Sequence, residues 1–351
     1  MGLKPLFFVG KRILITGHTG FKGSWLTVLL NDLGAEVVGI SLPPESPKSL
    51  YEAASINKEL ATEYFQDIRD EAAVIHLIND IKPDYVFHLA AQAFVRKSYK
   101  NPLETFATNV MGTANVMVAA LAQESVLGLT IATTDKVYEN LDSMELFIES
   151  DKLGGKDPYS ASKAASEIVI AAINSSNNPN RIPVTTVRAG NVIGGGDWGA
   201  DRIVPDIVNA IQNNQPLIIR NPNSTRPWQH VLDCLYGYLL VAQQHLEKAS
   251  DIPKSINFGP IDSLSVIELV KLFEGAFNMR IVQEIVSSQI SENTCLALDS
   301  SLARNKLNWQ PSFSQASAVS QTADWYSKFI KGEDARKLMQ TEISKFKVGK
   351  W

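Results

Sequence analysis

The sequence predicts an α/β fold: a doubly wound parallel sheet followed by a smaller lobe of mixed α/β structure. Three observations lead to this prediction. Short apolar runs alternate with helical patterns over the first 190 residues, a glycine-rich turn joins the first run to the first helix, and the alternation ends in a glycine- and proline-rich stretch after Gly190. Strands and helices that alternate along a chain are typical of a parallel sheet with helices on both faces.

Length and composition limit the classes of protein to which the chain can belong. Its 351 residues correspond to about two domains or lobes. A hydrophobic content of 45% with 20% charged residues excludes a disordered chain. The formal net charge is −4 and no block of basic residues occurs, so we expect neither nucleic acid nor a membrane surface as a partner. No apolar run is long enough to cross a membrane, and we expect a soluble, cytoplasmic protein.

The expected elements follow from the periodicity of the apolar residues. Strands are predicted over residues 12–15, 36–40, 84–89, 129–133 and 184–187. Helices are predicted over residues 21–33, 70–79, 102–123 and 158–172. In a parallel sheet of this kind ligands bind beyond the carboxyl ends of the strands, so the residues that directly follow each strand are the first candidates for a functional site.

The chain is predicted to pass between two lobes more than once. Residues 1–190 form the first lobe, and residues 228–260 return to it with an apolar helix and a strand. Residues 191–227 and 261–351 are predicted to form the second lobe. Within it, the charged segment 328–350 is expected to be a solvated helix.

A glycine-rich turn follows the first predicted strand. Gly17, Gly20 and Gly23 form the pattern G-x-x-G-x-x-G before an apolar helix, a variant of the Rossmann dinucleotide motif. Gly17 permits the tight turn, Gly20 lets the backbone approach a pyrophosphate, and Gly23 allows close packing of helix on strand. The phosphates are expected at the N-terminus of the helix, which attracts negative charge. A plain turn between a strand and a helix is the alternative.

The end of the second predicted strand indicates which dinucleotide is bound. No carboxylate stands there to bind a ribose; Ser41 is the polar residue at that place, and no arginine beside it is available for a 2′-phosphate. We therefore expect NAD rather than NADP. Asp67 either accepts a hydrogen bond from the adenine amino group or caps the following helix. Six further residues are expected to line the cofactor site: Phe21, Ile68, Leu89, Ala90, Tyr159 and Lys163.

Two groups of polar residues carry the predicted chemistry. Tyr159 and Lys163 lie four residues apart and therefore on one face of a helix. An ammonium group there is expected to lower the pKa of the phenol toward the range in which it takes a proton from a sugar hydroxyl. Thr134, Asp135 and Lys136 directly follow the fourth strand; Thr134 is predicted to hydrogen-bond the reacting hydroxyl, and the other two to form an acid/base pair. A helix cap with a solvated lysine is the alternative.

Several segments together carry a resemblance to a known family. They are residues 17–23 (Gly-His-Thr-Gly-Phe-Lys-Gly), 88–92 (His-Leu-Ala-Ala-Gln), 133–138 (Thr-Thr-Asp-Lys-Val-Tyr), Tyr159 with Lys163, and 190–198 (Gly-Asn-Val-Ile-Gly-Gly-Gly-Asp-Trp). In this combination the chain resembles the extended short-chain dehydrogenases/reductases that act on nucleotide sugars. Asp135-Lys136, with residues 226–233 (Arg-Pro-Trp-Gln-His-Val-Leu-Asp), is more narrowly similar to the CDP-glucose 4,6-dehydratase branch of that family.

The resemblance implies a lyase that uses NAD to convert CDP-glucose into CDP-4-dehydro-6-deoxyglucose and water. Tyr159, assisted by Thr134 and Lys163, would deprotonate the 4-hydroxyl as hydride leaves C4 for NAD. Water would then be lost across C5 and C6 with Asp135 as the acid, and the hydride would return to C6. Many relatives have a glutamate where this chain has Lys136. Lys136 is expected either to take the C5 proton or to stabilise the enolate by its charge.

The second lobe offers groups that suit a nucleoside diphosphate. Arg202 and Arg226 supply positive charge beside glycine-rich loops. The pattern of the family places Asn191 and Arg226 on the diphosphate, and Arg96 is expected near the sugar. His88 is predicted to be a packed histidine. The cytosine base is implied by the resemblance alone.

The family resemblance also implies a homodimer. Relatives pair the two long helices predicted over residues 102–123 and 158–172. The apolar or small residues on their faces are Val110, Val116, Val118, Ala119, Ala161, Ala164, Ala165 and Ile168.

Two other functions stay open from the sequence. A nucleotide-sugar 4-epimerase would share Tyr159, Lys163 and the glycine turn but would need no acid at C6. A non-catalytic dinucleotide-binding protein would be expected to lack the pair of Tyr159 and Lys163. No metal site is expected, because Cys234 and Cys295 stand far apart without C-x-x-C spacing.

Overall fold

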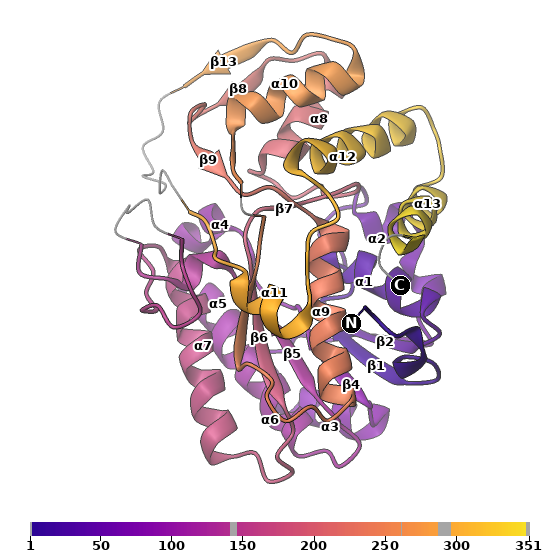
Figure 1. The fold of residues 1–351 in the computed structure, drawn as a ribbon, viewed down its shortest axis with the longest axis vertical. Coiled ribbons are helices and arrows are strands. Elements are labelled where there is room, and N and C mark those ends of the chain that lie inside the picture. Colours follow the sequence, from indigo (N-terminus) through magenta and orange to yellow (C-terminus); the bar gives the residue numbers. More distant parts are fainter. Residues whose placement is uncertain (1, 141–145, 261, 287–295, 349–351) are drawn as a thin grey trace.

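A large lobe built on a central sheet lies below a smaller lobe in Figure 1. The structure is a computed structural model that describes residues 2–140, 146–260, 262–286 and 296–348. Cys234 is a buried free thiol, and Cys295 lies outside the described residues. Among the described residues, no helix is both long enough and apolar enough to span a membrane.

The central sheet consists of parallel strands, as the sequence predicted. Its strands are β1 (Arg12–Thr16), β2 (Glu36–Ser41), β3 (Thr62–Phe65), β4 (Tyr85–His88), β5 (Leu129–Ala132), β6 (Val184–Ala189) and β11 (Ser255–Phe258). They lie in the order β11-β6-β5-β4-β1-β2-β3. Because β1 pairs with β2 on one side and with β4 on the other, the strand order reverses between β1 and β4. Ligands bind at such a switch point in doubly wound sheets.

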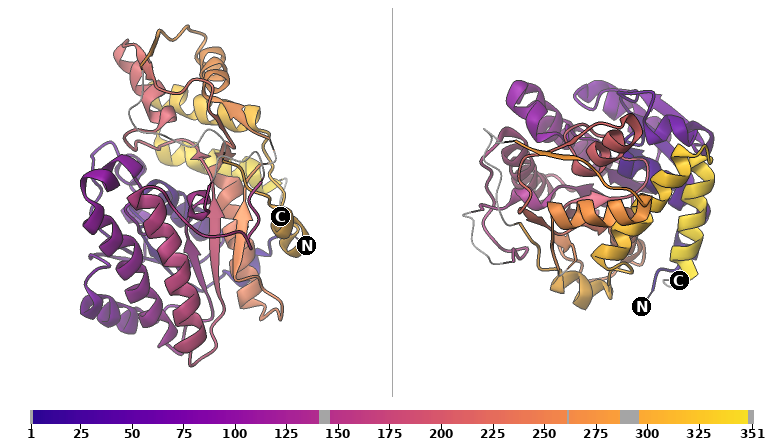
Figure 2. Two further views of the ribbon diagram at one scale, coloured as in Figure 1. Left: turned by 90° about the vertical axis from the view of Figure 1, so that its left-hand side faces the viewer. Right: turned by 90° about the horizontal axis from the view of Figure 1, so that it is seen from above.

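Helices cover both faces of this sheet (Figures 1 and 2). One face carries α1 (Phe21–Asp32) and α9 (Val231–Leu246), and the other carries α3 (Glu71–Ile81), α6 (Thr113–Leu121) and α7 (Pro158–Ser176). Side chains of a strand alternate between faces. Accordingly, Ile13 and Ile15 belong to the first core and Leu14 to the second. The shorter elements of this lobe are η1 (Pro5–Phe7), α2 (Leu50–Ala53), η2 (Ile56–Glu59), α4 (Val95–Lys100), α5 (Pro102–Phe106), η3 (Ala107–Gly112) and η4 (Asp135–Val137).

The single helix predicted over residues 102–123 is divided into α5, the π-helical segment η3 and α6. Asn109, in η3, is fully buried. Its side-chain amide donates to the carbonyl oxygen of Gln92 at 3.0 Å and to the hydroxyl of Ser162 at 2.8 Å. The wider π turn accompanies these contacts, which apolar periodicity does not reveal.

The second lobe contains the helices α8 (Ile203–Asn213), α10 (Val266–Phe277) and α12 (Gln315–Ile330), with α10 packed on α12. Short strand pairs connect them: β7 (Val192–Ile193) with β10 (Gln229–His230), β8 (Leu217–Ile219) with β13 (Gln283–Ile285), and β9 (Thr225–Arg226) with β12 (Leu264–Ser265). Two helices from the C-terminal segment also contact the sheet lobe. α11 (Ser301–Leu307) packs against β11 and α9, and α13 (Ala335–Val348) packs against α1 and α2. The division into two lobes at the predicted boundaries stays a prediction.

The expectation of a solvated helix over residues 328–350 is wrong for α13. One face of α13 is buried, and its buried side chains are Ala335, Leu338, Met339, Ile343 and Phe346. Their spacing of three and four residues places them on one stripe of a helix. The charged residues lie between them in the sequence, so the segment has a polar composition although it covers part of the core.

Candidate active site

A cavity of about 1560 Å³ lies at the carboxyl ends of the strands and is lined by residues of both lobes. Its volume exceeds the roughly 300–1,000 Å³ typical of a site for one small ligand, so it has room for a cofactor and a substrate. All residues predicted to bind or react line it: Gly17, Gly20, Phe21, Gly23, Ser41, Asp67, Ile68, Leu89, Ala90, Arg96, Thr134, Asp135, Lys136, Tyr159, Lys163, Asn191, Arg202 and Arg226. The roles assigned to them stay predictions.

The turn from β1 to α1 depends on glycine. Gly17 has a φ of +80°, and a Cβ there would lie 2.7 Å from the backbone nitrogen of Ala90. A Cβ at Gly23 would lie 2.1 Å from the carbonyl oxygen of Gly17. No side chain caps α1 at Gly20. The amide groups of the first helical turn are therefore available to a ligand, and the turn fits the diphosphate of a dinucleotide.

Ser41 and Asp67 lie at the part of the cavity beyond β2 and β3. The hydroxyl of Ser41 is 2.8 Å from that of Thr19. Asp67 pairs with Arg69 at 2.6 Å, and the hydrogen bonds from Arg69 lower the pKa of its carboxyl group. The alternative that Asp67 caps α3 is wrong, because Asp70 occupies the cap position. The carboxylate of Asp67 therefore lies at the cavity wall. Its hydrogen bond with the adenine amino group stays a prediction.

Tyr159 and Lys163 are almost completely buried on α7. The ammonium of Lys163 donates to the carbonyl oxygen of Ala132 at 3.0 Å. Burial raises the pKa of Tyr159 to about 12, although a hydrogen bond with Thr134 lowers it. Burial also lowers the pKa of Lys163 to about 8, and the charge of Lys22 contributes in the same direction.

The predicted direction of the Tyr159 pKa shift is therefore wrong for the protein alone. Loss of water around the phenol penalises the phenolate more than the surrounding groups stabilise it. The cationic group of Lys163 is directed to the end of β5 through Ala132. The chain by itself thus holds a protonated phenol and a lysine of lowered pKa on one face of α7.

Thr134, Asp135 and Lys136 form a compact polar group at the end of β5. Thr134 caps η4 and donates its hydroxyl to Oδ1 of Asp135 at 2.9 Å. The ammonium of Lys136 lies 3.3 Å from the same oxygen. Asp135 is 1% exposed, and its Oδ2 has no hydrogen-bond partner among the described residues. Gly190 faces this oxygen, since a Cβ at Gly190 would lie 3.0 Å from it. A buried carboxylate oxygen is thus left for a ligand at the cavity wall.

The residues predicted to bind the nucleotide sugar line the cavity from α4, β9 and the segments that follow β6. Arg96 pairs with Asp201 at 3.3 Å, and Arg202 donates to both carboxylate oxygens of Asp197 at 3.0 and 2.9 Å. Arg226 donates to the carbonyl oxygen of its neighbour Thr225. The side-chain oxygen of Asn191 is buried, with no hydrogen-bond partner in the described part of the chain. Arg202, Arg226 and Asn191 place positive charge and a polar oxygen without a partner among the described residues on the side of the second lobe, whereas Arg96 faces the cavity from α4.

His88 is packed beneath the cavity, as predicted. Its ring nitrogens lie 2.7 Å from the hydroxyl of Thr16 and 2.9 Å from that of Thr113. Burial lowers the pKa of His88 to about 3. The imidazole is therefore neutral and holds β1, β4 and α6 together.

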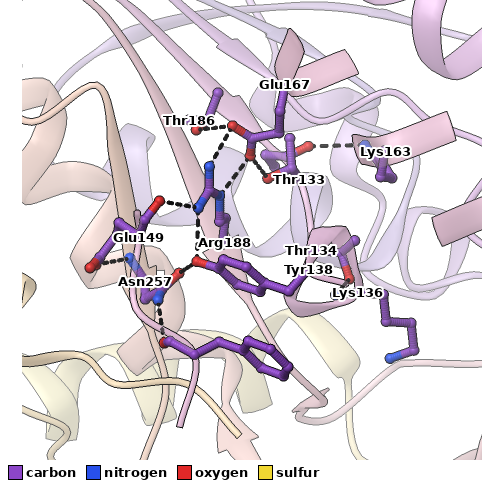
Figure 3. A network of polar contacts seen from close by, with 12 residues as sticks. Thr133, Thr134, Lys136, Tyr138, Glu149, Lys163, Glu167, Thr186, Arg188 and Asn257 are labelled. Carbon is purple, nitrogen blue, oxygen red and sulfur yellow. Dashed lines mark hydrogen bonds and ion pairs between the residues drawn. The ribbon is translucent and has the colours of Figure 1, made fainter. Parts of the chain in front are cut away.

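Sequence reasoning missed a buried ion pair behind the reactive residues, between Glu167 of α7 and Arg188 of β6 (Figure 3). Their side chains are 5% and 4% exposed. Two signals were present in the sequence. Glu167 follows Lys163 by four residues on the same helix face, and Arg188 is a charged residue at the end of a run that is otherwise without charge. The strand predicted over residues 184–187 ended one residue too early to include Arg188.

Comparison with known proteins finds relatives that match most of the chain. A family profile described as GDP-mannose 4,6 dehydratase matches residues 14–322. A CDP-glucose 4,6-dehydratase of Salmonella typhimurium is 39% identical, and the match covers 97% of each chain. An epimerase of Methanothermobacter thermautotrophicus is 25% identical with a TM-score of 0.80, covering 92% of this chain and 94% of that one.

A dTDP-glucose 4,6-dehydratase of Streptomyces venezuelae, solved with NAD bound, shares the fold. Its TM-score is 0.78 at 23% identity, over 90% of this chain and 97% of that one.

We predict that Gly17→Ala weakens NAD binding by more than tenfold, because the new methyl group meets the backbone of Ala90. Gly10→Ala is the matched control, since Gly10 also has a positive φ but a Cβ there would have no neighbouring atom within 4 Å. Both variants should lose some stability from the strained φ. Isothermal titration with NAD should separate them, and equal affinities would contradict the assigned role of the turn.

We also predict that Lys163→Met abolishes turnover yet stabilises the fold at pH 7, by on the order of 2 kcal/mol. The folded-state pKa of Lys163 is about 8, below the ordinary 10.5. The unfolded chain therefore binds more protons between these values, and the wild type gains stability as the pH rises through this window.

The difference in melting temperature between Lys163→Met and the wild type should thus be largest near neutral pH and should narrow toward pH 10. Circular dichroism melts at several pH values measure it. A difference that does not depend on pH would show that Lys163 carries no such penalty.

Proposed function

The chain belongs to the GDP-mannose 4,6-dehydratase family of extended short-chain dehydrogenases/reductases, and on that premise we propose that it dehydrates CDP-glucose to CDP-4-dehydro-6-deoxyglucose. The observation that carries the proposal is the buried carboxylate of Asp135 beside Tyr159, with one oxygen left without a partner among the described residues. An epimerase returns hydride to C4 and has no need of an acid at C6. The cytosine base rests on the similarity to the Salmonella enzyme.

The cavity residues fit NAD as the cofactor. The turn at Gly17, the uncapped start of α1 and the carboxylate of Asp67 match its diphosphate and adenosine parts. When bound, NAD supplies the acceptor and later the donor of hydride. The residues of the chain then have to bind the sugar, exclude water and move protons.

Tyr159 is the group that takes the proton of the sugar 4-hydroxyl. Its hydrogen bond with Thr134 links the phenol to the end of β5, and it favours the phenolate when the hydroxyl of Thr134 donates to Tyr159 instead of to Asp135. Lys163, four residues along the same helix face, supplies the ammonium whose charge stabilises this phenolate, and its hydrogen bond to the carbonyl oxygen of Ala132 holds it in place. Thr134 thus lies between Tyr159, which acts in the oxidation, and Asp135, which acts in the elimination.

Asp135 and Lys136 carry out the elimination. Their side chains lie 3.3 Å apart. A proton that passes from Lys136 to Asp135 leaves a carboxylic acid and a free amine. The amine takes the C5 proton, which the adjacent ketone makes acidic, and the acid protonates the departing C6 hydroxyl as water. Charge stabilisation of the enolate by Lys136 is the alternative role.

The diphosphate of the substrate is held on the side of the second lobe. Arg202 and Arg226 supply charge-assisted hydrogen bonds, and Asn191 supplies a polar side chain at the carboxyl end of β6. Arg96 approaches the sugar from the sheet lobe. The pairing of Arg202 with Asp197 holds its guanidinium in place before the substrate arrives.

We further propose a homodimer through α5, η3 and α7, which pack against one another in one chain. Large apolar side chains are exposed on this surface: Leu103, Phe106, Met111 and Ile168. Three of the residues expected there are instead in the core, namely Val116, Ala119 and Ala164. An exposed apolar surface of this kind is typical of an interface.

We predict that the purified protein converts CDP-glucose to a product lighter by one water, and that it does so faster than with UDP-, GDP- or dTDP-glucose. Tyr159→Phe should lower turnover by about 10³-fold or more, because the transferable proton is lost. Asp135→Asn should stop dehydration while oxidation at C4 persists. Mass spectrometry of quenched reactions distinguishes these outcomes, and an isomer of unchanged mass would identify an epimerase.

We predict that Ile168→Glu converts the dimer to monomers, because a charge replaces an apolar side chain that is 61% exposed in one chain. Leu6→Glu is the control, since Leu6 is 83% exposed on η1, outside this surface. Light scattering coupled to size exclusion measures both variants. A wild-type monomer at working concentration would refute the dimer.

A further inference from the structure

We propose that the ion pair of Glu167 and Arg188 is a positioning device that aligns the residues of C4 oxidation with those of C5–C6 elimination. The inference rests on the proposed function, since it concerns two successive steps of that reaction. Neither residue is among those that line the cavity, so both act through other residues.

The first argument is the attachment of α7 to the sheet. Tyr159, Lys163 and Glu167 follow one another at intervals of four residues and are all buried on the same face. Glu167 accepts from Nε and Nη2 of Arg188, each at 2.9 Å. A two-pronged contact between planar groups sets both the orientation and the position of the helix. The contact with β6 therefore sets the position of the Tyr159 phenol.

The second argument is the attachment of the segment that carries Asp135. At its start, the hydroxyl of Thr133 donates to Oε1 of Glu167 at 2.6 Å. At its end, Nη1 of Arg188 donates to the hydroxyl of Tyr138 at 2.8 Å, and the guanidinium lies 5.0 Å from the centre of that ring. Figure 3 shows both ends converging on the one ion pair. Thr134, Asp135 and Lys136 lie between these two anchors.

The third argument is that neighbouring groups occupy the other hydrogen-bonding positions of the pair. Thr186 donates to Oε2 of Glu167 at 2.8 Å. The carbonyl oxygen of Glu149 accepts from Arg188, and the hydroxyl of Tyr138 donates to Asn257 at 2.7 Å. A buried ion pair adds little net stability compared with apolar residues of the same volume. Its use here is the geometry that it imposes on α7 and on the segment from Thr133 to Tyr138.

The test compares two hydroxyl donors to the same carboxylate. Thr133→Val removes the anchor of the catalytic segment, whereas Thr186→Val removes a hydrogen bond of similar length to Glu167 that comes from β6, the strand that Arg188 already ties to Glu167. We expect Thr133→Val to lower kcat by about 10- to 100-fold with KM nearly unchanged. Thr186→Val should change kcat less than about threefold, and Thr133→Ser should restore most of the loss by restoring the donor.

The decisive readout is the product ratio in a quenched single turnover. In Thr133→Val, 4-keto sugar that retains its C6 oxygen should accumulate relative to the dehydrated product. Loss of folded protein alone would lower both products equally and leave this ratio unchanged. Tyr138→Phe removes the other anchor and provides an independent variant with the same expected ratio. Melting temperatures and NAD affinities of all variants identify any that fail to fold.

The proposed function and the positioning role fail in different ways. A wild type that makes no dehydrated product overturns the proposed function, and the inference falls with it. An active wild type overturns the inference alone if Thr133→Val and Thr186→Val have equal effects, or if the product ratio stays at the wild-type value in both Thr133→Val and Tyr138→Phe.

Discussion

The two-pronged contact between Glu167 and Arg188 is the interaction on which the reactive side of the cavity depends. It joins a helix to a strand that lies inside the sheet, between β5 and β11, and both partners are almost fully removed from water. A buried charge without its partner is costly, so each residue tolerates little displacement from the other. The helix that carries Tyr159 and the segment that carries Asp135 are held in place as well, because both are attached to Glu167 and Arg188.

Burial also explains the unusual proton affinities in the cavity. Tyr159 holds its proton more strongly than a free phenol, and Lys163 holds its proton less strongly than a free lysine. Both shifts penalise charge where water is scarce. Burial likewise leaves one side-chain oxygen of Asp135 and one of Asn191 without a hydrogen-bond partner among the described residues. Both oxygens lie without a hydrogen-bond partner in the described part of the chain, as expected at a site that binds a polar ligand.

The two lobes contribute different parts of the site. The groups proposed to transfer protons stand at the end of β5 and on η4 and α7 of the sheet lobe, whereas Arg202 and Arg226 come from the loops and short strands that follow β6. The chain leaves the sheet after β6 and returns at α9, and α13 later packs on α1. In the proposed function, recognition of the nucleotide and chemistry at the sugar thus fall to separate lobes that share one cavity.

Local patterns in the sequence were sufficient to predict the parallel sheet, its glycine turn and the wall of the cavity. Apolar periodicity and the steric needs of Gly17 and Gly23 are properties of short segments, and the ends of parallel strands meet at one edge whatever lies between them. Three features depended on contacts between distant segments. The π turn follows from bonds of Asn109, the buried face of α13 from the cover that it provides for α1, and the pairing of Arg188 from a glutamate 21 residues away. The raised pKa of Tyr159 also depended on the tertiary structure. Loss of water around a side chain results from three-dimensional packing, which the sequence alone does not reveal.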